Sequence, residues 1–186
     1  YYDDGTPMGQ SGDTECAIDA IAQAFAALPQ HRDRQHVQTA LHTAVKEMFD
    51  RDHSLVRLLW PPFDGLGKNP GYIRSYLPGI RENGGQYTHA GVWLAMGCLI
   101  SGMEQEGWEL LNAMHPSGRN EDIFKTEPYV ITADVYSNSQ NVGRGGWSWY
   151  TGAAGWYRRV AVEELLGIRL RSGILTVSPR LPREWD

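Results

Sequence analysis

The sequence is poor in cysteine and has no long apolar run. Its 186 residues include two cysteines, Cys16 and Cys98, and each lies in an apolar stretch. Two buried free thiols are therefore expected rather than a disulfide, which fits a reducing compartment. No segment of about 18 consecutive apolar residues occurs, and no charged-then-apolar leader opens the chain, so we expect no membrane-inserted segment and a cytoplasmic location.

Basic tracts and nucleotide-binding motifs are also absent from the sequence. The net charge is -5 and carries no long run of one sign, which argues against nucleic acid as a partner. There is no Walker loop, nucleophile elbow or dinucleotide fingerprint. The acidic residues near the start lack calcium-loop spacing, and the other histidines lack zinc spacing, so we expect neither a metal nor a cofactor. These histidines are interpreted as surface residues: His31, His36, His42, His53 and His115.

Apolar residues recur at helical spacing in five segments. Caps at Asp13 or Thr14 and at Asp33 predict helices that end near residue 28 and residue 48. Further helices are predicted over 88–100, 104–114 and about 153–166. Prolines and glycines leave 53–81 as a long loop with at most a short regular run around 55–60. The run 129–136 is ambiguous between strand and helix, and 168–170 with 174–177 predicts a β-hairpin.

Buried and amphipathic helices alternate along the chain, and long glycine-rich loops precede the buried ones. This order predicts a mainly α fold that is part of a two-layered helical barrel with a short C-terminal β-hairpin. We assign 1–167 to the barrel and 168–186 to the start of a β domain. The first residues resemble a mid-protein loop without an initiator Met, so we expect the sequence to be an excerpt of a larger protein.

Two glycine-rich loops enter apolar helices and carry the candidate site. The loop 81–87 leads to Thr88 and His89, and the loop 143–150 leads to Thr151 and Gly152. Helix starts offer unpaired amides and a partial positive charge, so the two together can bind inorganic phosphate, with Arg144 as a possible counter-charge. The alternative is that both pairs are ordinary caps of core helices.

Sugar-binding chemistry is concentrated in the same loops. Arg81, Glu82 and Gln86 supply hydrogen-bonding groups for sugar hydroxyls, and the face of Trp149 can stack on a pyranose ring. The alternatives are a surface ion pair for Glu82 and a core position for the tryptophan.

Several long motifs occur in order and resemble glycoside hydrolase family 94, which holds cellobiose and chitobiose phosphorylases and the C-terminal region of cyclic β-1,2-glucan synthases. The glucan synthase branch is the most similar. The motifs cover nearly the whole chain: YDDGTP at 2–7, ECAID at 15–19, PGIRENGGQYTH at 78–89, EPYV at 127–130, GRGGW at 143–147 and TGAAGW at 151–156.

The resemblance implies part of an (α/α)6 barrel in which phosphate, as a co-substrate, cleaves a β-glucoside or β-glucan with inversion to give α-glucose 1-phosphate. It implies that His89, Thr151 and Gly152 bind phosphate and that Glu82 contacts the glycosyl unit. Phosphate then replaces the water and base of an inverting hydrolase, so one acid suffices.

The family's general acid, the second Asp of an Asp-Trp-Asn-Asp-like motif, is absent from these residues. No catalytic residue is therefore assigned here, and the isolated chain is expected to be inactive. It is expected to self-associate or to bind the missing N-terminal part. The expected cytoplasmic location includes the case in which this region is the soluble domain of a membrane-bound synthase. The alternatives are an inverting hydrolase of helical-barrel type that uses Glu82, and a non-catalytic glucan-binding module that uses Trp60, Trp147 and Trp149.

Overall fold

Helices form the main body of the chain. The computed structural model describes residues 1–29, 33–65 and 67–185, so His31 lies outside the described residues. The helix that starts at Thr151 continues through a π-helical segment, η3, to its end near Leu165. The helices are α1 (Ala20–Phe25), α2 (Arg34–Met48), α3 (Thr88–Ile100), α4 (Glu104–Met114), α5 (Glu121–Phe124), α6 (Thr151–Arg159) and η3 (Val160–Leu165).

The helix boundaries confirm part of the sequence prediction. The Asp33 carboxylate accepts hydrogen bonds from the amides of Gln35 and His36 and so caps α2. Helices α3 and α4 occupy the predicted ranges. The first predicted helix was placed too early, because Ile18 and Asp19 form a strand and Asp19 is the N-cap of α1. Helix α6 begins two residues before the predicted Ala153, and α5 was not predicted.

Short antiparallel strand pairs connect the loops beneath the helices. Only Asp134 and Val135 of the ambiguous run 129–136 form a strand, and they pair with the residues just before α3. The predicted C-terminal hairpin is confirmed. The pairs are β1 (Ile18–Asp19) with β4 (Leu59–Trp60), β2 (Phe49–Asp50) with β3 (Leu55–Val56), β5 (Gln86–Tyr87) with β6 (Asp134–Val135), and β7 (Ile168–Arg171) with β8 (Ile174–Val177).

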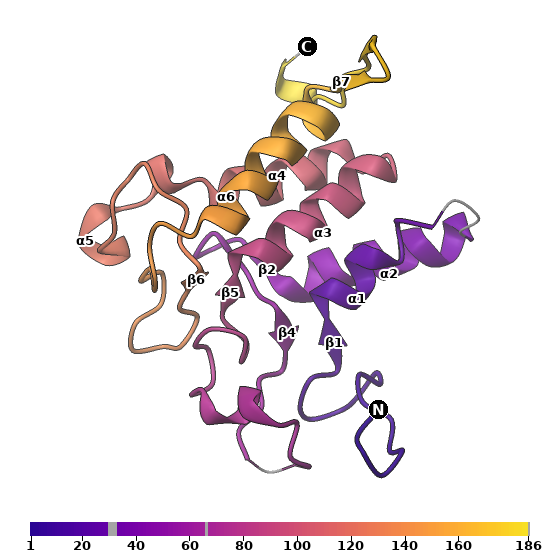
Figure 1. Cartoon of the computed structure of the whole chain (residues 1–186). Coiled ribbons are helices and arrows are strands. Elements are labelled where there is room, and N and C mark those ends of the chain that lie inside the picture. Colours follow the sequence, from indigo (N-terminus) through magenta and orange to yellow (C-terminus); the bar gives the residue numbers. More distant parts are fainter. Residues whose placement is uncertain (30–32, 66, 186) are drawn as a thin grey trace.

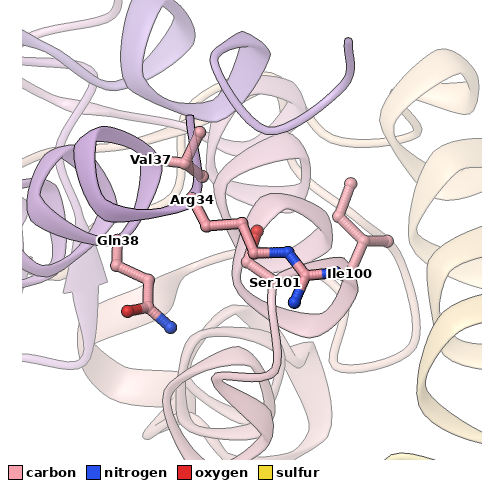
Figure 2. A pocket seen from close by; sticks show the side chains of 5 residues that line it. All are labelled: Arg34, Val37, Gln38, Ile100 and Ser101. Carbon is pink, nitrogen blue, oxygen red and sulfur yellow. The ribbon is translucent and has the colours of Figure 1, made fainter. Parts of the chain in front are cut away.

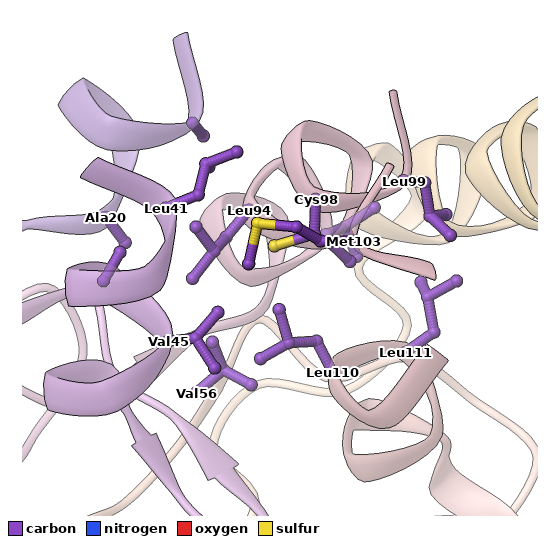
Figure 3. Packing of buried hydrophobic residues seen from close by; sticks show 14 of the residues in the cluster. Ala20, Leu41, Val45, Val56, Leu94, Cys98, Leu99, Met103, Leu110 and Leu111 are labelled. Carbon is purple, nitrogen blue, oxygen red and sulfur yellow. The ribbon is translucent and has the colours of Figure 1, made fainter. Parts of the chain in front are cut away.

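The main core lies between α2, α3 and α4. Leu41 and Val45 of α2 face Leu94 of α3 and Leu110 of α4, and all four are buried (Figure 3). Helix α4 approaches α3 closely because it has a glycine at Gly107, where a Cβ atom would lie 2.6 Å from Leu99 Cγ. Burying such aliphatic side chains stabilises a fold by about 1.5–3 kcal/mol each. Helix α3 is therefore held on several sides as the central element.

Helices α3 and α6 pack against each other and begin at the same end of the molecule (Figure 1). The loops and short strand pairs gather at this end, whereas the β7–β8 hairpin follows the far end of α6. The first residues of α3 and α6 are thus presented side by side. Within the described residues, none of the helices has the length and apolar character needed to cross a bilayer.

Candidate anion and sugar site

The starts of α3 and α6 meet, as the candidate phosphate site requires. Thr88 and His89 are the first residues of α3, and Thr151 and Gly152 are the first residues of α6. A Cβ atom added to Gly152 would lie 4.0 Å from His89 Cε1. Neither helix has a side-chain hydrogen bond at its N-cap. We call these four residues, two from the start of each helix, the helix-start pair.

The donors of the helix-start pair are not all equally available. The Thr88 amide donates to the carbonyl of Ala133 at 2.9 Å, and the Thr88 side chain is buried. Thr151 and Gly152 are exposed. An anion would therefore be bound from the α6 side and by the His89 ring rather than by the first amide of α3.

The His89 ring lies half-buried between aromatic side chains. Its centroid is 4.4 Å from that of Trp93 and 6.2 Å from that of Trp156. Its Nε2 atom is buried and has no hydrogen-bond partner. Burial lowers the pKa of His89 from its ordinary value, so the ring is held as neutral imidazole near neutral pH. A neutral imidazole with a free nitrogen can still donate to, or accept from, a bound oxyanion.

The N-cap residues of the two helices are joined by their hydroxyl groups. Tyr87 Oη lies 2.9 Å from Tyr150 Oη, and the two rings meet edge to face at 6.2 Å between centroids. Burial, followed by the hydrogen bond to Tyr150, raises the pKa of Tyr87 well above its ordinary value, so the Tyr87 hydroxyl keeps its proton. The pair fixes the separation of the two helix starts.

A cluster of one cation and two carboxylates lies beside the helix starts. Arg81 Nε is 3.4 Å from Glu82 Oε2, and Arg81 Nη1 is 4.0 Å from Asp134 Oδ1. Asp134 pairs through its backbone with Tyr87, the residue just before α3, so this cluster lies next to the helix-start pair. We call Arg81, Glu82 and Asp134 the carboxylate–guanidinium cluster. Atoms of Glu82 and Arg81 in this cluster have no hydrogen-bond partner, which suits a ligand with several hydroxyl groups.

Asp134 was not predicted from the sequence as a site residue. It stands in the run YVITADVY at 129–136, where a strand pattern suggests only packing. Its side chain is 1% exposed, and its backbone pairs with Tyr87. Two features of the sequence could have indicated a site here. Asp134 is the one acidic residue in that apolar run, and a pair of glycines follows at 145–146.

Gln86 takes a different role from the predicted one. The side chain is buried, its Oε1 accepts a hydrogen bond from the Val56 amide at 3.1 Å, and its Nε2 donates to Thr88 Oγ1 at 3.2 Å. These two hydrogen bonds join β3 to the start of α3. The placement argues against direct substrate contact because a buried amide with both ends bonded presents nothing to a ligand.

Trp149 lies on the surface next to the start of α6. It is 62% exposed, its Nε1 donates to Glu127 Oε1 at 3.0 Å, and its ring meets that of Tyr129 edge to face. Its backbone is left-handed, with φ of 59°. A non-glycine residue in that conformation is strained, and such strain is often found at functional sites. The exposed ring face is available for stacking on a sugar.

The hollow shown in Figure 2 is separate from this site. It has a volume of about 250 Å³ and lies between the start of α2 and the end of α3. His89 lies at the opposite end of α3, about 16 Å away at the helical rise per residue. The hollow is lined by Arg34, Val37, Gln38, Ile100 and Ser101.

Residues 1–167 match the family model described as the glycosyl hydrolase 94 superfamily, catalytic domain. The chain therefore belongs to that family. It is 42% identical over its full length to the cyclic β-(1,2)-glucan synthase NdvB of Rhizobium meliloti (strain 1021), of which it covers 7%. It is also 31% identical over its full length to a 3-O-β-D-glucopyranosyl-β-D-glucuronide phosphorylase of Paenibacillus borealis, of which it covers 24%.

A third relative is an N,N'-diacetylchitobiose phosphorylase of Vibrio furnissii, which is 26% identical over 98% of this chain and of which 22% is covered. The chain thus spans less than a quarter of each of these relatives. These relatives are named as a glucan synthase and as phosphorylases, and all of them match this chain over nearly its whole length.

Proposed function

We propose that the complete protein is an inverting phosphorylase that cleaves a β-glucosidic bond with inorganic phosphate and releases α-glucose 1-phosphate. The observation that carries this proposal is the meeting of the α3 and α6 starts, where a Cβ atom added to Gly152 would lie 4.0 Å from His89 Cε1. The exposed start of α6, together with the His89 ring beside it, favours an anion such as phosphate. The family membership and the phosphorylases among the relatives support the same reaction class.

The chain's residues divide between the two substrates. His89, Thr151 and Gly152 hold phosphate against the anomeric carbon, while Glu82, Arg81 and Trp149 hold the glucosyl unit. A phosphate oxygen forms the new bond to the anomeric carbon as the glucosidic C–O bond breaks, and the leaving oxygen takes a proton from a general acid. We assign that acid to an aspartate outside these 186 residues, so the isolated chain is inactive.

We further propose that these helices are part of an (α/α)6 barrel that the rest of the protein completes. Apolar side chains of the β7–β8 hairpin are exposed, as expected if a further part of the protein packs on them. More than 60% of each of these side chains is exposed: Leu170, Ile174, Leu175 and Val177. Apolar patches of this kind promote association. Sedimentation velocity should show the isolated chain as dimers or larger species at micromolar concentration, and a monodisperse monomer would count against this proposal.

The reaction is tested by incubating the complete protein with a panel of β-linked glucosides and glucans. We expect release of α-glucose 1-phosphate that depends on added phosphate, measured by a coupled phosphoglucomutase assay. Production of free glucose at the same rate without phosphate would instead identify an inverting hydrolase. Saccharide binding without any turnover would identify a glucan-binding module.

A further inference from the structure

Asp134 is a buried ionisable residue whose carboxylate faces the Arg81 side chain and nearby backbone amides without a well-formed hydrogen bond. It is 1% exposed, and neither Oδ1 nor Oδ2 has a partner within hydrogen-bonding geometry. Burial raises the pKa of Asp134, while the nearby charge of Arg81 and the backbone amides of Trp147 and Arg81 lower it. A carboxylate removed from water is costly unless a cation or hydrogen-bond donors face it. Arg81 is the cation that faces it, at 4.0 Å.

The backbone opposite Asp134 is shaped to admit this carboxylate. A Cβ atom on Gly146 would lie 2.1 Å from Asp134 Oδ1, which no side chain could tolerate. The Gly146 amide also donates to the Asp134 carbonyl at 2.8 Å. The absence of a side chain at Gly146 therefore leaves room for the Asp134 carboxylate beside Arg81.

Arg81 is constrained from several directions at once. Its backbone is left-handed, with φ of 49°, and its guanidinium lies 4.4 Å from the ring centroid of Trp147. Burial lowers the pKa of Arg81, but the carboxylates of Glu82 and Asp134 outweigh that effect and raise it. The guanidinium is thus a permanent cation between two carboxylates. The Glu82 Oε2 atom on its other side is buried and has no hydrogen-bond partner.

We propose that Asp134 is a positioning residue that fixes the Arg81 guanidinium, and through it the Glu82 carboxylate, for binding of sugar hydroxyl groups. This inference rests on the proposed function. Glu82 Oε2 and the Nε and Nη1 atoms of Arg81 have no hydrogen-bond partner, so the two side chains keep an acceptor and donors that the hydroxyl groups of a glucosyl unit can satisfy. Asp134 itself is too deeply buried to touch the sugar. It acts by holding the Arg81 guanidinium in its observed place between Asp134 and Glu82.

The test is the isosteric variant Asp134→Asn in the complete protein, which removes the charge and keeps the shape. We expect the KM for the β-glucoside to rise by roughly tenfold to a hundredfold, the range that loss of one hydrogen bond to a charged group produces. The KM for phosphate should change by less than about twofold, because the helix-start pair is left intact. Hydrogen–deuterium exchange of peptides covering 79–86 should rise, while exchange in α3 and α4 stays unchanged.

A second variant reaches the same cluster from another element. Gly146→Ala places a methyl group against Asp134 Oδ1 and should reproduce both the change in sugar KM and the local rise in exchange. Glu164→Gln is the matched control, because Glu164 is a carboxylate paired with Arg180 at 3.2 Å near the C-terminal hairpin. It should change neither the sugar KM nor exchange at 79–86.

The outcomes separate this inference from the proposed function. Unchanged exchange at 79–86 in both Asp134→Asn and Gly146→Ala, or an unchanged sugar KM in the active variants, would overturn the positioning role of Asp134. Increased exchange spread over α3 and α4 would also overturn it, because it would mean a general loss of stability. An unmodified protein that releases no glucose 1-phosphate would overturn the proposed function, whereas the exchange measurement would still decide whether Asp134 positions Arg81.

Discussion

Replacing His89 with alanine in the complete protein should lower the phosphate-dependent release of α-glucose 1-phosphate by roughly a hundredfold to a thousandfold, as is typical when one group that stabilises a reacting oxyanion is lost. The reason is the placement of the ring, whose unpartnered Nε2 atom lies at the junction of α3 and α6. The loss should appear in kcat/KM for phosphate, measured at saturating glucoside. Binding of the glucoside alone, measured by calorimetry, should be little changed.

The controls for this prediction separate chemistry from packing. His89→Gln keeps a hydrogen-bonding group and more of the volume between Trp93 and Trp156, so it should retain more activity than the alanine variant. His115→Ala removes an exposed histidine that also lies against an aromatic ring, that of Tyr157 at 6.1 Å. It should leave phosphate use unchanged. Equal losses of kcat/KM for phosphate in His89→Ala and His115→Ala would show that His89 is not part of the phosphate site.

Replacing Gly152 with alanine should separate stability from function. An added Cβ would only just touch His89 Cε1, at 4.0 Å, so the helix can accept it. Alanine is also favoured over glycine inside a helix by up to about 1 kcal/mol, so the melting temperature should stay the same or rise. The new methyl group nevertheless occupies the space between the two helix starts. We expect the KM for phosphate to rise by roughly tenfold to a hundredfold.

The matched control is Gly155→Ala in the same helix. A Cβ atom at Gly155 meets nothing within 4 Å, so this variant should gain similar helix stability without any change in phosphate KM. Thermal unfolding and steady-state kinetics on both variants give the comparison. If the two glycine variants have the same phosphate KM, the gap beside Gly152 is not where phosphate binds.

The local patterns of the sequence predicted what depends on neighbouring residues. The Asp33 cap and the bounds of α3 follow from capping chemistry and from an almost wholly apolar segment, which needs no knowledge of distant partners. The start of the first helix could not be predicted from such local patterns. Ile18 and Asp19 pair with β4, whose residues lie some forty positions along the chain, and this tertiary pairing overrides the helical spacing.

The candidate site shows the same division. The residues of the helix-start pair were found because glycine-rich loops that enter apolar helices are visible in the sequence. The burial of Gln86 in β5 was not visible from its position in a glycine-rich loop. Asp134 was missed because its partner Arg81 lies more than fifty residues away and the room for its carboxylate depends on Gly146. Neither the contact of Asp134 with Arg81 nor its contact with Gly146 produces a recognisable spacing of residues in the sequence.

The bond between the phenols of Tyr87 and Tyr150 has a consequence for selectivity. It ties together two chain segments that are 63 positions apart, at the residues from which α3 and α6 depart. The width of the opening between those helices is therefore set before any ligand arrives, and little conformational entropy is lost on binding. A rigid aperture of this kind discriminates oxyanions by their dimensions, so that sulfate and arsenate, as tetrahedral mimics, compete where the flat nitrate ion does not.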